Sequence, residues 1–352
     1  MLKDKEVYRT LPSQTAQQIL RLLDTMWKSF FNCCKVWRKT PEKFKGRPKP
    51  PNYKKKHGEF LVIFTNQQCR IKEGFLYFPS RVGLPPVKTR IKEGVHQVRL
   101  IPKGSYYILE IVYGKEETNL NLNEKRVIGI DLGLNNIVTI VNNAGLKPAI
   151  IKGGVVKSIN QFYNKELAKY KRYKDTQGLS FETKRLRRLT RKRNNKIHDL
   201  FHKISRRIVN YCIEHNFGTV IIGYNHMWKH KITLGKKTNQ NFVQLPFYKL
   251  IHQLIYKSHL VGISVRLESE FYTSRCSFFD GEPVAKHKRY AGRRVSRGLF
   301  KTKEGLLINA DVNAGYNILK KALPNAISAD GIEGVGFHPF PMSFHERNCI
   351  LE

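Results

Sequence analysis

Apolar residues near the start of the chain recur at steps of three and four positions. After Pro12 and Ser13, the positions with this spacing are Ala16, Ile19, Leu20, Leu23, Trp27, Phe30, Cys34 and Trp37. This period predicts a single amphipathic helix within residues 1–40, with its apolar face packed in a core. The two tryptophans could instead stack on nucleic-acid bases, but aromatic residues at helical spacing are more typical of packing.

The pattern changes to short β-type runs between residues 60 and 118. The runs FLVIFT, GFLYFP, VHQVRL and SYYILEIVY are separated by Gly, Pro and Lys, which predicts a small antiparallel β domain that is compatible with an open barrel. Residues 41–59 before it are basic and rich in proline, as in an extended linker. Its lysines Lys54, Lys55 and Lys56 suit a phosphate backbone, although a lysine run is equally typical of a solvated surface.

A β-hairpin is predicted from Val127 to Val141, where two apolar runs flank a Gly-Leu-Asn-Asn turn. Asp131 ends the first run. Burying an ionised carboxylate costs several kcal/mol unless it is paired or binds a cation. Asp131 is therefore expected either to cap the turn or to hold a metal ion.

A long helical insertion follows at residues 160–215, after a third short strand. One stretch of it is highly basic, with Lys184, Arg185, Arg187, Arg188, Arg191, Lys192 and Arg193. An apolar stripe from Ile197 to Cys212 comes directly after, so one helix is predicted to bury its second half and to present its first half to nucleic acid. The alternative is a solvated charged helix.

Two further strands and a helix start bring more acids to the ends of elements. The strand from Ile263 to Leu267 leads to Glu268 and Glu270, and Asp311 falls in the first turn of a helix whose Ala314 and Gly315 permit close approach to a sheet. Strands with interspersed helices and acids at their ends predict an α+β protein with a ribonuclease-H-like nuclease domain. Such acids suit two-metal phosphodiester hydrolysis with Mg²⁺ or Mn²⁺.

The net charge of the chain indicates which kind of molecule it binds. The chain has 64 Lys and Arg against 27 Asp and Glu, a formal net charge of +37, which favours a nucleic-acid partner. The sequence has no long apolar run or signal peptide, so we expect no membrane partner and a cytoplasmic location. The six cysteines form no CxxC pair, which argues against a disulfide framework and a zinc ribbon.

Several motifs together resemble the TnpB family, the OrfB-type RNA-guided DNA nucleases of bacterial insertion sequences that are related to type V CRISPR effectors. The motifs are GIDLGLNN, VIIGYNHMWK, EFYTSRCSFFDGE, GRRVSRGLF and NADVNAGYNI, and the likeness extends from about Leu11 to Pro339. It implies that Asp131 and Asp311 are the first and third acids of a RuvC-like centre that binds Mg²⁺ and cuts target DNA. It also implies a guide RNA from the end of the transposable element and a bacterial protein that is nucleoid-associated when bound to DNA.

The resemblance further implies a domain order. Residues 1–40 would be part of a recognition lobe, residues 60–118 a wedge-like domain, and residues 124–322 the nuclease domain, with the insertion 160–215 and a basic loop at 275–307. Residues 323–352 are expected to form an irregular tail.

The sequence departs from the family in three respects. The usual second acid is replaced by Gly223 and Tyr224, so the resemblance assigns that role to Glu270, with Glu268 in reserve, or leaves the site without its third acid. Only Cys276 and His287 stand where relatives often carry a zinc ribbon, and no zinc site is expected. The chain also begins nearer its first long helix than its relatives do, which implies a shortened N-terminus.

Two other functions compete with the nuclease. The first is a cleavage-deficient protein, a decayed or domesticated TnpB, which acts only by binding RNA or DNA. The second is an actin-like ATPase, because GIDLG also resembles the first phosphate loop of that fold. The ATPase would need a second phosphate loop that the sequence lacks, and its nucleotide would not explain the basic charge.

Overall fold

The protein is described by a computed structural model that covers residues 5–54, 58–104, 106–179, 182–225, 245–324, 327, 337 and 339–344. The chain divides into two compact units, residues 1–116 and 117–352. Within the described ranges, no helix is both long enough and apolar enough to cross a membrane.

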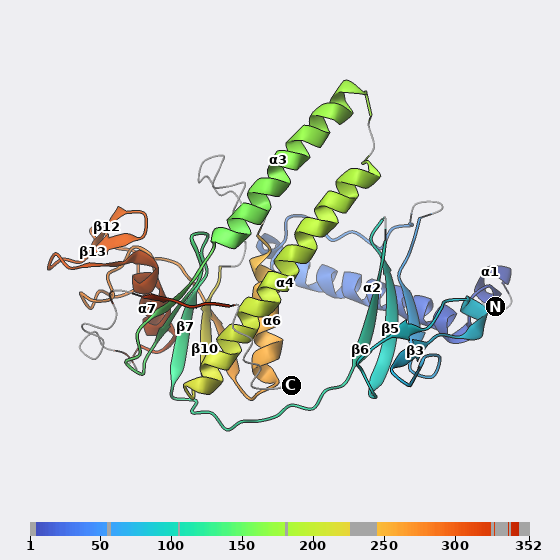
Figure 1. Cartoon of the computed structure of the whole chain (residues 1–352), viewed down its shortest axis with the longest axis horizontal. Coiled ribbons are helices and arrows are strands. Elements are labelled where there is room, and N and C mark those ends of the chain that lie inside the picture. Colours follow the sequence, from blue (N-terminus) through green and yellow to red (C-terminus); the bar gives the residue numbers. More distant parts are fainter. Residues whose placement is uncertain are drawn as a thin grey trace. The chain divides into compact units, whose positions relative to one another are not determined.

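The first unit combines a long helix with two small antiparallel sheets (Figure 1). Its helices are α1 (Glu6–Arg9) and α2 (Ser13–Lys39), with short 3-10 turns η2 (Pro41–Lys43) and η3 (Ser80–Val82). One sheet has the order β1 (Val62–Thr65), β5 (Val95–Pro102) and β6 (Tyr107–Tyr113), and the other has β2 (Arg70–Lys72), β3 (Phe75–Tyr77) and β4 (Val87–Lys88). The core that the two sheets share consists of Phe64, Cys69, Leu76 and Val98.

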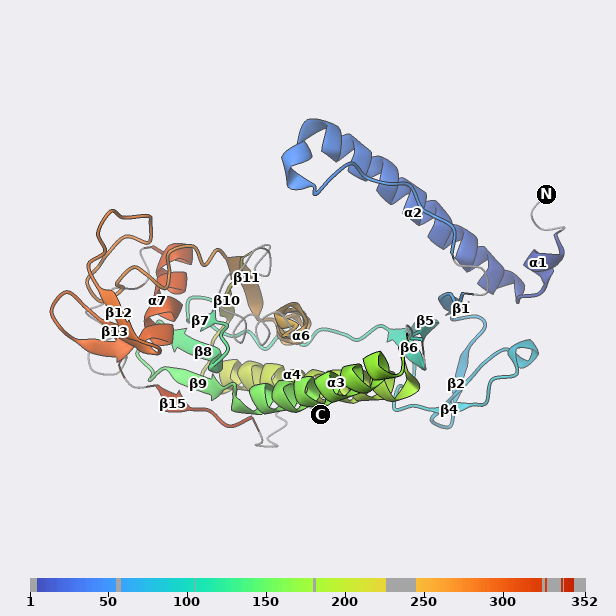
Figure 2. The same ribbon diagram turned by 90° about the horizontal axis from the view of Figure 1, so that it is seen from above.

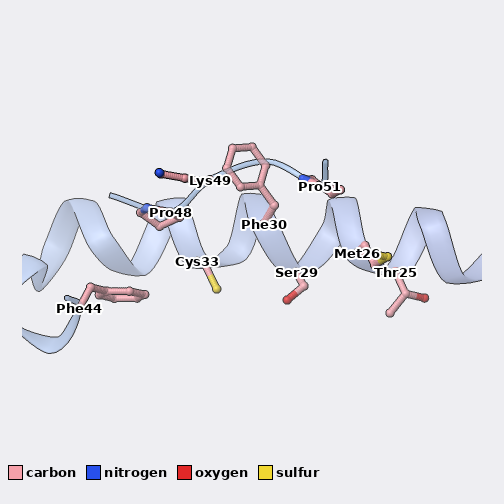
Figure 3. A pocket seen from close by; sticks show the side chains of 9 residues that line it. All are labelled: Thr25, Met26, Ser29, Phe30, Cys33, Phe44, Pro48, Lys49 and Pro51. Carbon is pink, nitrogen blue, oxygen red and sulfur yellow. The ribbon is translucent and has the colours of Figure 1, made fainter. Parts of the chain in front are cut away.

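Helix α2 forms where the spacing predicts it, but the predicted burial of its apolar face is wrong for the described chain. Trp27 is 39% exposed, and Leu20, Leu23 and Phe31 are also exposed. Only Thr15 and Ala16 are buried, because the β domain contacts just the first turns of the helix. Farther along, residues 44–51 run beside α2 and leave a hollow of about 610 Å³ that Cys33 and Lys49 help to line (Figure 3).

The second unit contains a six-stranded sheet with the order β11-β10-β7-β8-β9-β15. These strands are β7 (Val127–Asp131), β8 (Asn136–Asn142), β9 (Ala149–Lys152), β10 (Thr219–Gly223), β11 (Ser264–Glu268) and β15 (Phe340–Pro341). Strands β7, β8 and β9 pair antiparallel, whereas β10 is parallel to both β7 and β11. This order and these directions confirm the ribonuclease-H-like architecture. The tail expected to be irregular supplies β15, which pairs with β9.

Helices cover the two faces of this sheet (Figure 2). On one face, α4 (Lys184–Glu214) and α6 (Phe247–His259) pack against strand residues such as Ile128, Ile130 and Ile222. On the other face lies α7 (Ala310–Ala322), packed against Val127, Val141 and Ile221. The first half of α4 extends beyond the sheet beside α3 (Gly154–Thr176), as Figure 1 shows. A second, smaller sheet in this unit consists of β12 (Arg293–Ser296), β13 (Leu299–Lys301) and β14 (Leu307–Asn309) and leads into α7.

Helix α7 can approach the sheet closely because small residues meet at the contact. A Cβ built on Gly129 would lie 3.1 Å from the backbone oxygen of Gly315 and 2.5 Å from Cγ of Leu319. A Cβ on Gly315 would in turn lie 3.1 Å from both γ carbons of Val141. These distances confirm the close approach predicted from Ala314 and Gly315, and they bring the start of α7 to the end of β7.

Candidate active site

Asp131 is the last residue of β7 and points to the face of the sheet that α7 covers. Side chains alternate along a strand, and Val127 and Gly129 both contact α7, so the position two residues farther on has the same direction. The carboxylate therefore lies on the α7 face at the carboxyl end of the strand.

Asp311 lies in the first turn of α7, which is fixed by its N-cap. Asn309 Oδ1 accepts hydrogen bonds from the backbone N–H groups of Asp311 (2.9 Å) and Val312 (3.2 Å). The Asp311 carboxylate accepts a 2.8 Å hydrogen bond from Asn136 Nδ2, at the start of β8. Its other oxygen lies 3.4 Å from Nη2 of Arg294 in β12. The turn after Asp131 and the start of α7 are thus tied together.

The two carboxylates lie near enough to perturb each other. Burial raises the pKa of Asp131 above its usual range, and the negative charge of Asp311 raises it further, whereas the Arg294 guanidinium lowers it. Two carboxylates with only one nearby cation disfavour the ionised form. A divalent cation would remove this penalty, so the pair has the chemistry of a site for a hard metal ion.

Glu270 occupies the space left by a glycine at the end of the neighbouring strand. A Cβ built on Gly223 would lie 2.7 Å from Glu270 Oε1, 2.8 Å from its Cγ and 2.5 Å from Cδ1 of Ile318. Gly223 ends β10, and the preceding pair, Ile222 and Ile130, is in register with β7. The Glu270 side chain therefore lies over the end of the strand beside Asp131, on the α7 face.

Glu268 has a different environment, although it is paired with Gly223 in the sheet. Its Oε1 accepts a 2.9 Å hydrogen bond from the N–H of Ser269, the next residue. The backbone N–H of Glu270 donates to Asn225 Oδ1 at 3.1 Å. Of the two glutamates, Glu270 is the one whose side chain fills the space at Gly223.

These three acids do not form a complete metal cage by themselves. Among the described residues, no three His, Cys, Asp or Glu side chains are close enough together to hold a metal ion. Mg²⁺ in nucleotide-processing sites is usually held by one or two carboxylates together with substrate phosphates and water. The Asp131 and Asp311 pair, with Glu270 beside it, fits that mode of binding.

Three asparagines, spaced four residues apart at the N-cap of α7 and along the helix, make hydrogen bonds that hold the site in place. Their role was not predicted from the sequence. Besides the cap Asn309, Asn313 accepts from Phe278 N–H (3.0 Å) and donates to the Cys276 carbonyl (2.8 Å), and Asn317 donates to the carbonyls of Thr273 (2.8 Å) and Cys276 (2.7 Å). They hold the loop that follows Glu270. The feature of the sequence that could have indicated them is the repeat of asparagine every four residues, because asparagine is otherwise unfavourable inside a helix.

The basic residues predicted to contact nucleic acid have several local partners. Arg185 lies over the Tyr170 ring (4.7 Å to the centroid), Arg187 pairs with Glu182 (3.3 Å), and Arg193 donates to Asn160. Lys184, Arg188 and Lys192 are exposed and recur every fourth residue, so they form one row along α4, while Arg191 is partly buried.

The remaining predicted positions lie elsewhere. Lys54 is exposed, with Nζ 5.0 Å from the Phe60 ring centroid, and Lys55 and Lys56 fall outside the described residues. Cys276 Sγ lies 3.4 Å from the Ala285 carbonyl, and His287 Nε2 is 2.8 Å from the Pro283 carbonyl.

Two family models match the chain. Residues 110–229 match the OrfB_IS605 family, described as a probable transposase, and residues 247–318 match the Cas12f1-like TNB domain. The TnpB-like protein ORF457 of Acidianus two-tailed virus is 22% identical over 254 residues. That match covers 68% of this chain and 49% of the viral protein, so the chain spans about half the length of this curated relative.

Solved structures of Cas12f are also similar to parts of the chain. A cryo-EM structure of a Cas12f1-sgRNA-target DNA complex matches at 15% identity with a TM-score of 0.49, covering 80% of this chain and 67% of that one. A CRISPR-Cas12f ternary complex matches at 15% identity with a TM-score of 0.45, over 64% and 45% of the two chains.

The family matches fall on the segments that build the sheet and its acids. The first contains β7 to β10 with Asp131, and the second contains α6, β11 and α7 with Glu270 and Asp311. Together with the TnpB-like viral relative, they show that these segments are similar to the OrfB_IS605 and Cas12f1-like families, in line with the motifs that resemble TnpB.

Proposed function

We propose that this protein is an RNA-guided, Mg²⁺-dependent DNA endonuclease of a transposable element. The observation that carries the proposal is the proximity of the Asp131 and Asp311 carboxylates, with Glu270 over the end of the adjacent strand on the same face of the sheet. The similarity to a probable transposase family and to a TnpB-like viral protein supports a nucleic-acid substrate. The net charge of +37 suits both polyanions.

In this proposal the three acids together provide the ligands for the metal ions. Asp131 and Asp311 would provide the oxygen ligands for Mg²⁺ or Mn²⁺, and Glu270 would complete the site from the neighbouring strand. When bound, two such ions activate water and stabilise the leaving oxygen of the phosphodiester. Arg294 lies 3.4 Å from the Asp311 carboxylate, and in this proposal its guanidinium would also pair with the negatively charged phosphate of the substrate.

Asn136 and Asn309 act as positioning residues. Asn136 fixes the Asp311 carboxylate by a hydrogen bond, and Asn309 fixes the backbone of the turn that carries it. Because these contacts link β8, α7 and the loop before it, small shifts of α7 would misplace the acids. A misplacement of about 1 Å commonly costs about 100-fold in rate.

The proposal is tested by expressing the full chain with its native flanking DNA, sequencing the RNA that copurifies, and assaying cleavage of matching DNA in Mg²⁺. Glu270→Gln should reduce the cleavage rate by at least about 100-fold while RNA binding persists, and Glu268→Gln is the matched control that should change it little. The reverse pattern would transfer the role to Glu268. Guided DNA binding without any cleavage by the unmodified protein would favour the cleavage-deficient alternative.

A further inference from the structure

A hollow of about 360 Å³ lies between α3 and α4, away from the carboxylates. Its apolar lining includes Ile159 and Phe162 on α3 and Leu189 on α4. Phe162 is 61% exposed, an unusual position for a phenylalanine in a groove between two helices. This volume is at the lower end of the range for small-ligand sites, which is suitable for one flat ring system.

Two other lining residues, Arg193 and Tyr163, are held in place by contacts between the two helices. Arg193 donates two hydrogen bonds to the buried Asn160 Oδ1, at 2.9 and 2.8 Å, and lies over the Tyr163 ring at 5.7 Å from its centroid. The Tyr163 hydroxyl is 3.2 Å from Thr190 Oγ1. These contacts join α3 to α4 at the hollow and fix its shape before any ligand binds.

The rim of the hollow is cationic. Lys192 and Lys196 line it and are exposed, and none of the eight residues that line it is acidic. Lys192 also belongs to the row of exposed basic residues with Lys184 and Arg188. A row of cations that runs into an aromatic hollow is the arrangement that binds single-stranded nucleic acid, with phosphates along the row and a base on the ring.

The same helix connects the hollow with the carboxylate site. Lys157, next to the lining residue Ser158, hydrogen-bonds Asn135 in the turn that follows Asp131. The next residue, Asn136 at the start of β8, donates a hydrogen bond to the Asp311 carboxylate. From Lys157 to Phe162 the helix rises about 7.5 Å, roughly two nucleotide steps of a stacked strand. Helix α3 therefore carries the hollow within about two turns of its contact with the turn that follows Asp131.

We propose that the hollow between α3 and α4 binds an unpaired base of the DNA strand that passes the carboxylate site. The base stacks on Phe162, and the adjoining phosphates lie on Lys192 and Lys196. This inference rests on the proposed nuclease function for the identity of the strand. It adds a binding site that fixes the register of the strand relative to the acids.

The test uses the full chain in EDTA, where binding is measured without cleavage. The probes are single-stranded 20-nucleotide DNAs that carry 2-aminopurine at successive positions, and RNAs of the same sequence. Phe162→Ala should weaken DNA binding about tenfold and abolish stacking quench at one position, while Phe162→Tyr should retain both. Tyr173→Ala is the matched control, because Tyr173 is an exposed aromatic on the same helix but outside the hollow.

The outcomes separate this inference from the proposed function. DNA binding and quench unchanged in Phe162→Ala would overturn the site, as would an effect on the RNA probes alone. Loss of DNA binding in Phe162→Ala by a protein that cuts nothing in Mg²⁺ would overturn the nuclease function and leave the site standing. Equal melting temperatures of Phe162→Ala and the unmodified protein should exclude unfolding as the cause.

Discussion

Helices α7 and α2 have the same kind of sequence pattern and opposite surroundings. Nine of the thirteen residues of α7 are buried, whereas α2 has 27 residues and buries only two. Helix α7 packs on the sheet through Gly129 and Gly315, while most of the apolar side of α2 is exposed or only partly buried in the described structure. The spacing of apolar residues thus determines a helix and its preferred side, but not what covers that side.

The difference in burial between α7 and α2 matters for the proposed function. Two of the site acids lie at the packed contact between α7 and the sheet, since the position of Asp311 depends on the fit of α7 against β7 and β8. Helix α2 holds no member of the site, so its apolar side can be changed without moving the acids. Three experiments test this contrast, beginning with the largest expected effect.

Matched leucine truncations should separate the two helices directly. Leu319→Ala removes a side chain that is 0% exposed on α7 and should lower the free energy of unfolding by about 2–5 kcal/mol. Leu23→Ala removes one that is 45% exposed on α2 and should change it by less than about 0.5 kcal/mol. Urea unfolding followed by circular dichroism measures both. Similar losses in the two variants would show that the apolar side of α2 is covered in solution.

A methyl group at Gly223 should disturb both packing and the site. The Cβ of Gly223→Ala would overlap Ile318 and displace Glu270, so we expect a destabilisation of about 1–3 kcal/mol and a cleavage rate at least about tenfold lower. Gly154→Ala is the control, because nothing lies within 4 Å of a Cβ at that position. If Gly223→Ala cleaves DNA at the normal rate, Glu270 does not serve the site.

The smallest expected effect concerns the titration of Asp131. Its folded-state pKa is raised by burial and by Asp311, so as pH rises the unfolded chain loses this proton first, near pH 4. The folded state therefore loses stability from there up through the raised pKa of Asp131. In EDTA at neutral pH, Asp131→Asn should be more stable than the unmodified protein by about 1 kcal/mol.

Melting temperatures from pH 4 to 8 measure this effect. The difference between Asp131→Asn and the unmodified protein should grow with pH, and Mg²⁺ should stabilise only the unmodified protein. Asp199→Asn, which removes an exposed carboxylate on α4, controls for the change of net charge. A pH-independent difference would contradict the electrostatic coupling of Asp131 and Asp311.

The sequence alone was enough for the local elements. Alternating and helical periods located the hairpin β7–β8, the two-part helix α4 and the start of α7 at Asp311, because each depends on residues close together in the chain. Motifs and charge indicated the family and a polyanionic partner. The pattern of strands, helices and acids also indicated the ribonuclease-H-like fold class, but not the order of the strands in the sheet.

Tertiary structure decided what depends on contacts between distant segments. The position of Glu270 over Gly223, the link from Asn136 to Asp311 and the proximity of Arg294 each join residues far apart in the chain. The burial of α7 and the exposure of α2 likewise depend on which surfaces meet. A periodic sequence records the side a helix prefers to bury, whereas the partner for that side is set by the packing of the whole unit.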